Sequence, residues 1–198
     1  MLIFPRPAPT LGPNGFLPHS QPDDAREDLL LMQRVCRDDE AAFAALVAKH
    51  QQPLLNFFAR LGSAARAEDL AQETFVRLWK SRARYRPAAK LSTYLYTIAR
   101  HAWQDDLRRA SRFRLFSERY RREIPASTDG GLPRLHRDMD IQSALSQLPP
   151  KHREVLVLAV CQELPYADVA RILSIPVGTV KSRVYNALST LERLFHGK

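Results

Sequence analysis

Cysteine is scarce in this chain of 198 residues, which contains only Cys36 and Cys161. Two cysteines so far apart cannot form a disulfide framework, and no stretch offers the closely spaced ligands of a structural zinc site. We therefore expect no metal site and no cofactor, and a protein that works in the reducing cytoplasm.

Long apolar runs are also missing. No segment approaches the roughly 20 apolar residues that span a bilayer, which excludes insertion into a membrane. The first 22 residues lack a charged start followed by a sustained apolar stretch, so they make a poor secretory signal. The sequence shows no convincing alternation of a strand and no internal repeat of fixed period, and it therefore predicts an all-α protein.

Positive charge is abundant, because 30 lysines and arginines outnumber 21 acids and give a formal net charge of +9. Residues 29–112 contain 15 of the basic side chains and 8 of the acidic ones. The stretch from Arg77 to Lys90 carries six basic side chains and no acid. Such a stripe favours a polyanion as partner, since each neutralised phosphate releases condensed counterions. The alternative is a solvated helix face followed by a basic loop.

Changes in composition and in apolar periodicity divide the chain into four segments. Residues 1–25 hold six prolines, which block helix formation, and predict a disordered tail. Residues 26–112 and 141–198 carry apolar side chains at helical spacing and predict two small helical domains. Between them, residues 113–140 lose this periodicity and include two glycines and two prolines, which predicts a flexible linker at a domain boundary.

Four helices are expected in the first domain. Pro53 is expected to kink the second helix or to start a new turn, and Gly62 to end it. The fourth helix is expected from about Ser92 to about Arg112, and we expect Trp103 on it to pack in the core rather than to stack on a base. The buried side of this helix is predicted to consist of Tyr94, Leu95, Ile98, Ala102 and Leu107.

The C-terminal domain contains a helix-turn-helix pattern. Tyr166–Leu173 predicts a short helix, Ser174–Pro176 a tight turn, and Val177 the start of a second helix. The exposed side of this second helix combines hydroxyls and cations, which bind phosphate or guanine, with an amide able to read adenine. These side chains are Thr179, Lys181, Ser182, Arg183 and Asn186. The alternative is an ordinary pair of helices with a polar outer face.

Both helical units resemble one protein family. The segments RAEDLAQETFVRLW (66–79), LSTYLYTIAR (91–100) and DDLRR (105–109) look like region 2 of bacterial sigma factors. The segments LPP (148–150), REVL (153–156), YADVA (166–170) and GTVKSR (178–183) look like region 4. Their pairing and order resemble the extracytoplasmic-function (ECF) group of the sigma-70 family, which has only these two domains. The resemblance covers roughly residues 28–112 and 140–195.

The resemblance implies a non-enzymatic protein that binds core RNA polymerase through its β and β′ subunits, directs it to promoters and helps to open the duplex. It also implies an anti-sigma factor as a partner. The residues in the family's polymerase-binding positions are Asp69, Gln72, Glu73 and Arg77. Those in the segment that faces the −10 element are Arg84, Arg86, Lys90, Tyr94, Arg100, His101, Arg108 and Arg109. The second helix of the helix-turn-helix would bind the −35 duplex.

Some positions depart from the family pattern. Family members usually have asparagine where this chain has His101, and often tryptophan where it has Tyr94. Glycine is commoner than Ser174 in the turn, although serine can still occupy a turn. Tyr94 is as consistent with a place in the core as with a contact to a promoter base.

Two other functions compete with this interpretation. A helix-turn-helix regulator that acts without polymerase would explain the C-terminal domain but would leave residues 66–109 unexplained. A metal-dependent nuclease would use the clustered acids Glu68, Asp69, Glu73, Asp105 and Asp106. Two-metal sites need converging oxygen ligands, whereas neighbouring residues on a helix point to different sides.

Overall fold

The structure is a computed structural model that describes residues 22–120 and 136–196. Every regular element in these two ranges is helical, which confirms the predicted all-α fold. The predicted tail of 1–25 lies outside the described residues except at its last four positions, where the first helix has already begun. Much of the predicted linker of 113–140 also lies outside them.

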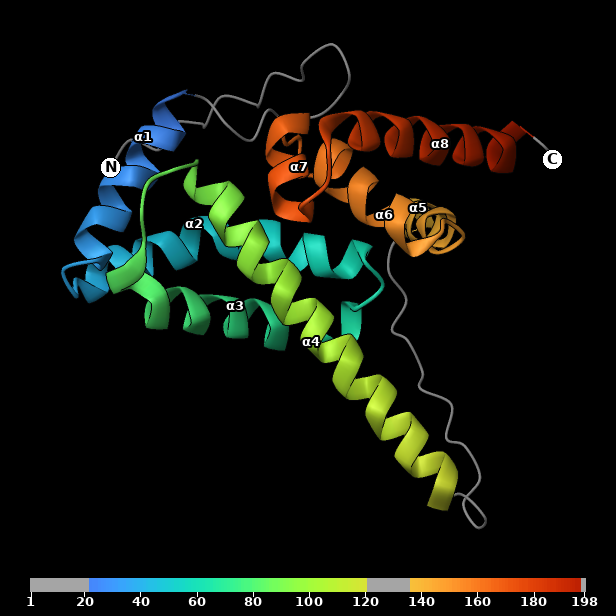
Figure 1. Cartoon of the computed structure of the whole chain (residues 1–198), viewed down its shortest axis with the longest axis horizontal. Coiled ribbons are helices and arrows are strands. Elements are labelled where there is room, and N and C mark those ends of the chain that lie inside the picture. The colour runs from blue at the N-terminus through green and yellow to red at the C-terminus, as the bar shows by residue number, and fades with distance from the viewer. Residues whose placement is uncertain (1–21, 121–135, 197–198) are drawn as a thin grey trace, which may run out of the picture.

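The N-terminal unit is a bundle of four helices joined by short turns (Figure 1). The helices are α1 (Pro22–Val35), α2 (Glu40–Arg60), α3 (Ala67–Ser81) and α4 (Leu91–Tyr120). Single 3-10 turns, η1 (Ala64–Arg66) and η2 (Arg82–Arg84), lie at the two ends of α3.

Helix α2 shows how local sequence sets an element. Asp39 caps it, because its carboxylate accepts a hydrogen bond from the Ala42 backbone N–H at 2.9 Å. The helix continues through Pro53 without interruption, so no new helix starts there, and Gly62 follows its end with a φ of +93°. Phe57 and Phe58 are fully buried and pack against each other with ring centroids 5.2 Å apart.

Helix α4 departs from the prediction in length and in its buried side. It continues eight residues past the expected end at Arg112, into the predicted linker. Leu107 is 46% exposed, so its predicted burial is wrong. The reason is visible in Figure 1, where the C-terminal half of α4 projects beyond the other helices of the described ranges. Trp103 is buried as expected and donates a hydrogen bond to Ser63 Oγ.

The C-terminal unit contains the predicted helix-turn-helix. Its elements are α5 (His136–Ser146), α6 (Pro150–Leu156), the π-helical turn η3 (Val157–Cys161), α7 (Tyr166–Leu173) and α8 (Val177–His196). Ser174 ends α7 in the left-handed conformation with a φ of 54°, which explains why glycine suits this position. Val180, Val184 and Ala187 are buried on the inward side of α8, whereas Leu188 is 42% exposed.

The two units pack against each other. Helix α7 lies on α4, η3 lies on α2, and their buried side chains form one continuous apolar cluster. Figure 1 shows α6, α7 and α8 as a layer over α2 and the first turns of α4. Helix α8 lies on the outside of this layer, and its predicted DNA-binding side chains are exposed or partly exposed.

Candidate protein and nucleic-acid interfaces

A groove of about 710 Å³ lies between α2 and α3. Its wall is apolar and comes from both helices, and its rim is polar and includes Glu40, Glu68 and Gln72. Val76 lies in this groove with 38% of its surface exposed. The apolar lining residues are Phe43, Val47, Leu55, Ala71, Phe75, Val76 and Trp79. An apolar groove with a charged rim, next to an exposed helix face, can hold one side of an amphipathic helix.

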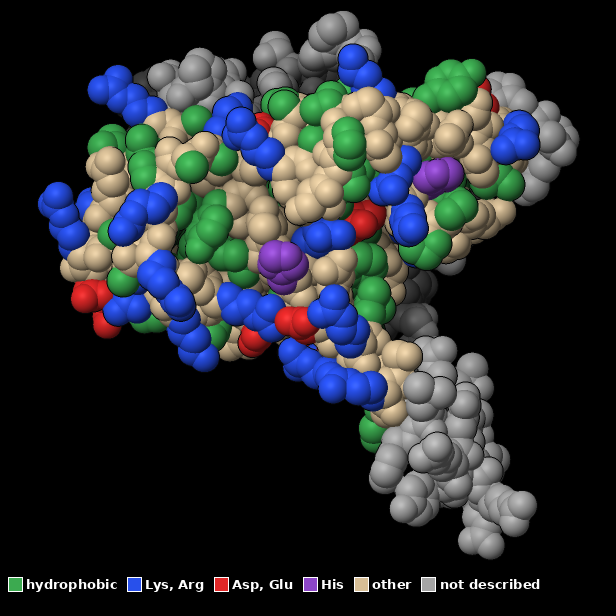
Figure 2. All heavy atoms as spheres, in the orientation of Figure 1, with side chains coloured by type: hydrophobic (Ala, Val, Ile, Leu, Met, Phe, Trp, Pro, Cys, Tyr) green, Lys and Arg blue, Asp and Glu red, His purple; other side chains and the backbone are tan. Residues whose placement is uncertain are grey.

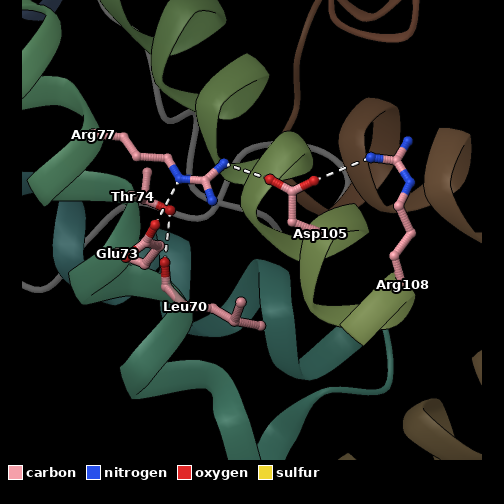
Figure 3. Close-up of polar contacts among 6 residues, drawn as sticks. All are labelled: Leu70, Glu73, Thr74, Arg77, Asp105 and Arg108. Atoms are coloured by element: carbon pink, nitrogen blue, oxygen red, sulfur yellow. Dashed lines mark hydrogen bonds and ion pairs between the residues drawn. The ribbon is translucent and has the colours of Figure 1, made fainter. Parts of the chain in front are cut away.

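The predicted polymerase-binding residues divide between this groove and a neighbouring polar network. Gln72 lines the groove, and Asp69 is exposed beside it. Glu73 and Arg77 instead turn toward α4, as Figure 3 shows. Arg77 Nε donates to Glu73 Oε1 at 2.8 Å, and Arg77 Nη1 donates to Asp105 Oδ2 at 2.9 Å. Arg77 on α3 therefore links this helix to α4.

The ion pair between Arg77 and Asp105 shifts the pKa values of both groups. The Arg77 guanidinium, together with Arg108 on the other side, holds the pKa of Asp105 below its usual range. Hydrogen bonding to Glu73, with a further bond to Asp105, raises the pKa of Arg77. Both shifts favour the charged forms of Arg77 and Asp105, so the contact between α3 and α4 is an ion-pair network.

Four of the five acids that suggested a nuclease, all except Glu68, pair with an arginine. Arg66 reaches Asp69 and Asp106, both at 3.2 Å, while Asp105 pairs with Arg77 and Arg108. Among residues 22–120 and 136–196, no three His, Cys, Asp or Glu side chains gather in a way that could hold a metal ion. These carboxylates organise helix contacts and do not converge on one another.

A stripe of predicted DNA-binding side chains runs along α4. Tyr94, His101 and Arg108 are seven residues apart, so they lie on the same side of the helix. At a rise of about 1.5 Å per residue, Tyr94 and Arg108 lie about 21 Å apart along the helix axis. This distance is close to the length of about six stacked base pairs. Figure 2 shows Lys and Arg side chains gathered on the side of the molecule that α3 and α4 form. Arg84, Arg86, Lys90 and Arg109 are exposed or partly exposed around this stripe.

Tyr94 and Arg100 are less free than the rest of this set. The Tyr94 hydroxyl lies 3.0 Å from Ser81 Oγ, and its ring packs on Tyr85 with centroids 5.3 Å apart, while part of its surface remains exposed. Arg100 Nε donates to Glu154 Oε1 of the C-terminal unit at 2.6 Å. The Arg100 side chain is only 17% exposed, so in this arrangement it faces the second unit.

The first turns of α8 present the predicted duplex-reading residues. Lys181, Ser182 and Asn186 are exposed, and Thr179 and Arg183 are partly exposed. All five lie in the N-terminal half of α8, which is the part of a recognition helix that reaches base edges in the major groove. Gly178 has open space around it, so the backbone at the start of this helix is accessible.

Sequence reasoning missed three features of these surfaces. The apolar groove was not foreseen, although its exposed Val76 breaks the polar face of α3. Tyr185, 71% exposed on α8, lies one turn after Lys181, and helical spacing alone could have identified it. The pairing of Arg100 with Glu154 joins residues 54 positions apart, and no local signal indicates it.

Comparison with known proteins supports both halves of the resemblance. A sigma-70 region 2 profile matches residues 46–113, and a sigma-70 region 4 profile matches residues 138–191. The RNA polymerase sigma factor CarQ of Myxococcus xanthus is 32% identical over 166 residues, with 82% of this chain and 94% of CarQ covered. The ECF RNA polymerase sigma factor SigW of Bacillus subtilis is also 32% identical, over 179 residues, with 82% and 93% covered.

A solved structure has a similar fold. The sigma factor RpoE of Bartonella quintana, determined in complex with the anti-sigma factor NepR, is 28% identical with a TM-score of 0.65. The match covers 77% of this chain and 96% of RpoE. Separately, none of the helices in the described part of the chain is both long and apolar enough to cross a membrane.

Proposed function

The chain belongs to the ECF group of the sigma-70 family, and from this premise we propose that its two units divide the work of a sigma factor between them. It is an RNA polymerase sigma factor, which binds core polymerase, directs it to specific promoters and promotes strand opening. The observation that carries this conclusion is the presence of both family regions, in order, in one chain.

The α2–α3 groove and the adjacent face of α3 form the polymerase-docking surface in this proposal. One helix of a coiled coil in the largest polymerase subunit would place apolar side chains against Phe75, Val76 and Trp79. The exposed Asp69 and the groove-lining Gln72 would orient it, since rim charges act on orientation and association rate more than on affinity. Glu73 and Arg77 would support this surface by fixing α3 to α4.

The stripe on α4 would capture the −10 region of one promoter strand. Basic side chains at Arg84, Arg86, Lys90, Arg108 and Arg109 would hold the backbone, while Tyr94 and His101 would face the bases. Arg100 would join this set once it is free of Glu154. Capture of an unstacked strand by cations and aromatic rings is what strand opening requires.

The N-terminal half of α8 would enter the major groove of the −35 duplex. Lys181 and Arg183 would contact phosphate or guanine, Thr179 and Ser182 would contact phosphate, and Asn186 would read adenine. This assignment is supported by the exposure of the helix face in the packed molecule.

Further properties follow from the same proposal. Because it acts on the transcription machinery, the protein would work in the cytoplasm and catalyse no reaction of its own. An anti-sigma factor would bind it and hold it inactive, and the complex of RpoE with the anti-sigma factor NepR supports a partner of this kind.

Gel filtration with purified bacterial core RNA polymerase tests this proposal against the rival function. A sigma factor co-elutes with the core enzyme, whereas a helix-turn-helix regulator that acts alone does not. Elution of the whole chain at its free volume, at concentrations well above micromolar, would favour the regulator. The Asp69→Arg variant, which is expected to bind core polymerase more weakly, provides the matched control.

A further inference from the structure

The contact between the two units includes Arg100, a residue that the proposed function needs for DNA. Arg100 Nε donates to Glu154 Oε1 at 2.6 Å, and the two side chains are 17% and 10% exposed. One turn earlier on α4, the buried Tyr96 hydroxyl donates to Gln162 Oε1 at 2.5 Å. Since Arg100 and Tyr96 lie on the same side of α4, both bonds pin that side to the C-terminal unit.

Three further hydrogen bonds run to backbone carbonyls across the same boundary. Arg60 Nη1 donates to Cys161 O at 3.2 Å, and Gln142 Nε2 donates to Ala59 O at 2.7 Å. Arg153 Nη1 reaches Leu61 O at 3.4 Å. The acceptors at Ala59 and Leu61 lie at the end of α2, and Cys161 ends η3. The boundary is therefore held by directional contacts as well as by the shared apolar cluster.

When the two units are packed together, the proposed DNA-binding surface on α8 stays exposed, whereas part of the one on α4 is covered. On α8, Lys181, Ser182 and Asn186 remain exposed, so the −35 surface is open. On α4, Arg100 is covered and its charge is neutralised by Glu154. A promoter strand that uses Arg100 must separate it from Glu154, which leaves a carboxylate without its partner.

We propose that this packing is an autoinhibitory contact in which Glu154 occupies Arg100, so that strand capture by α4 requires the C-terminal unit to move off α4. This inference rests on the proposed function only for the role of Arg100 in DNA binding. The free chain would then bind duplex through α8 but bind single strands weakly, and the −10 strand and Glu154 would compete for one guanidinium. A competing closed state lowers apparent affinity in proportion to the fraction of open molecules.

The Glu154→Ala variant of the full chain tests this contact. Small-angle X-ray scattering should show a larger radius of gyration for the variant than for the wild type. Fluorescence anisotropy with a labelled 12-nucleotide single strand of mixed sequence should show roughly fivefold to tenfold tighter binding, as expected if about a tenth to a fifth of wild-type molecules are open. Glu192→Ala is the matched control, because it makes the same charge change on the exposed face of α8 and should change neither quantity in this way.

Three further variants separate the ion pair from a general loss of folding. Gln162→Ala removes the bond to Tyr96 without changing the charge and should also enlarge the radius. Arg100→Glu alone should open the molecule, and Arg100→Glu combined with Glu154→Arg should close it again.

The outcomes distinguish this inference from the proposed function. A Glu154→Ala variant that stays compact, or that opens yet binds the single strand no better than Glu192→Ala, overturns the autoinhibitory contact. Opening with tighter strand binding supports it, even if the chain fails to direct polymerase to a promoter. In that case the proposed function fails and the contact stands.

Discussion

Arg183 and its neighbours on α8 give the most direct residue-level test of DNA binding. We predict that Arg183→Ala weakens binding to the −35 duplex by roughly 1–3 kcal/mol if Arg183 reads a base. Lys181→Ala should instead weaken binding to all sequences evenly and reduce the salt dependence by about one phosphate contact. Anisotropy with duplex DNA at several salt concentrations measures both effects. Unchanged footprints and promoter output for Arg183→Ala would count against its assignment.

Asp69 is the corresponding residue on the polymerase side. We predict that Asp69→Arg lowers capture by core polymerase at least tenfold in a pull-down, which corresponds to about 1.4 kcal/mol. The fold should not change, because the Asp69 side chain is 68% exposed and its pair with Arg66 is a surface ion pair. Thermal unfolding measured by circular dichroism provides the control. Equal capture of the variant and the wild type would remove Asp69 from the interface.

Single residues also show the limit of prediction from sequence. Helical spacing places Lys181, Ser182 and Asn186 on one exposed face, and the structure agrees. Helical spacing could not show that Glu154 would cover Arg100, because Glu154 belongs to the other unit. It also could not separate Arg77 from Gln72, since one faces Asp105 on α4 and the other faces the groove. Partners across helices depend on packing, which local periodicity does not specify.

At the scale of elements, α1 is fixed to α2 by a buried acid. Asp28, 6% exposed, lies 2.8 Å from Lys49 Nζ and 3.1 Å from His50 Nε2. Burial opposes the charged form of Asp28, but His50 and Lys49 outweigh it, so the pKa of Asp28 lies below its ordinary value of 3.8. The same acid, with Glu27 and Asp24, raises the pKa of Lys49 despite the desolvation that opposes it.

This arrangement predicts how stability depends on pH. Because the pKa of Asp28 is lowered by folding, its contribution is present above 3.8 and is lost as the pH falls through the lowered value. Asp28→Asn should reduce the free energy of unfolding by about 1–3 kcal/mol at neutral pH. It should also flatten the loss of stability below about pH 4. Urea unfolding between pH 3 and 7 measures this, and parallel curves for variant and wild type would contradict it.

The turn between α7 and α8 gives a second prediction at this scale. Ser174 has a φ of 54°, a conformation that costs a residue with a side chain roughly 1–2 kcal/mol. Glycine avoids this cost but loses more entropy on folding, so Ser174→Gly should stabilise the protein by about 0.5–1 kcal/mol. Ser143→Gly, within α5, should instead destabilise it by a similar amount. A lower melting temperature for Ser174→Gly would show that the turn is not strained.

Whole elements were easier to predict than their ends. The four N-terminal helices and the helix-turn-helix follow from apolar spacing, caps and prolines. The length of α4 did not, because the prolines and glycines of residues 113–140 indicated a linker that begins after Arg112, whereas the helix continues to Tyr120. The expected burial of Leu107 failed because the C-terminal half of α4 projects beyond the bundle.

At the scale of the molecule, the sequence indicated two units but not their arrangement. The contacts of Arg60, Tyr96 and Arg100 join residues 54 to 101 positions apart, and no local pattern indicates such pairs. In the packed form, the groove and α8 are both accessible, while one side of α4 is covered. Under the proposed assignments, this arrangement would let the protein bind polymerase and the −35 duplex before it engages the −10 strand.

Run-off transcription with purified core polymerase over a library of genomic fragments is the most direct test of the central claim. We predict discrete transcripts that appear only when this chain is added, from start sites that share −35 and −10 sequences at fixed spacing. Arg183→Ala should reduce these transcripts, and Asp69→Arg should abolish them. Transcripts that are the same with and without the chain, under conditions in which a known sigma factor directs initiation, would contradict the claim.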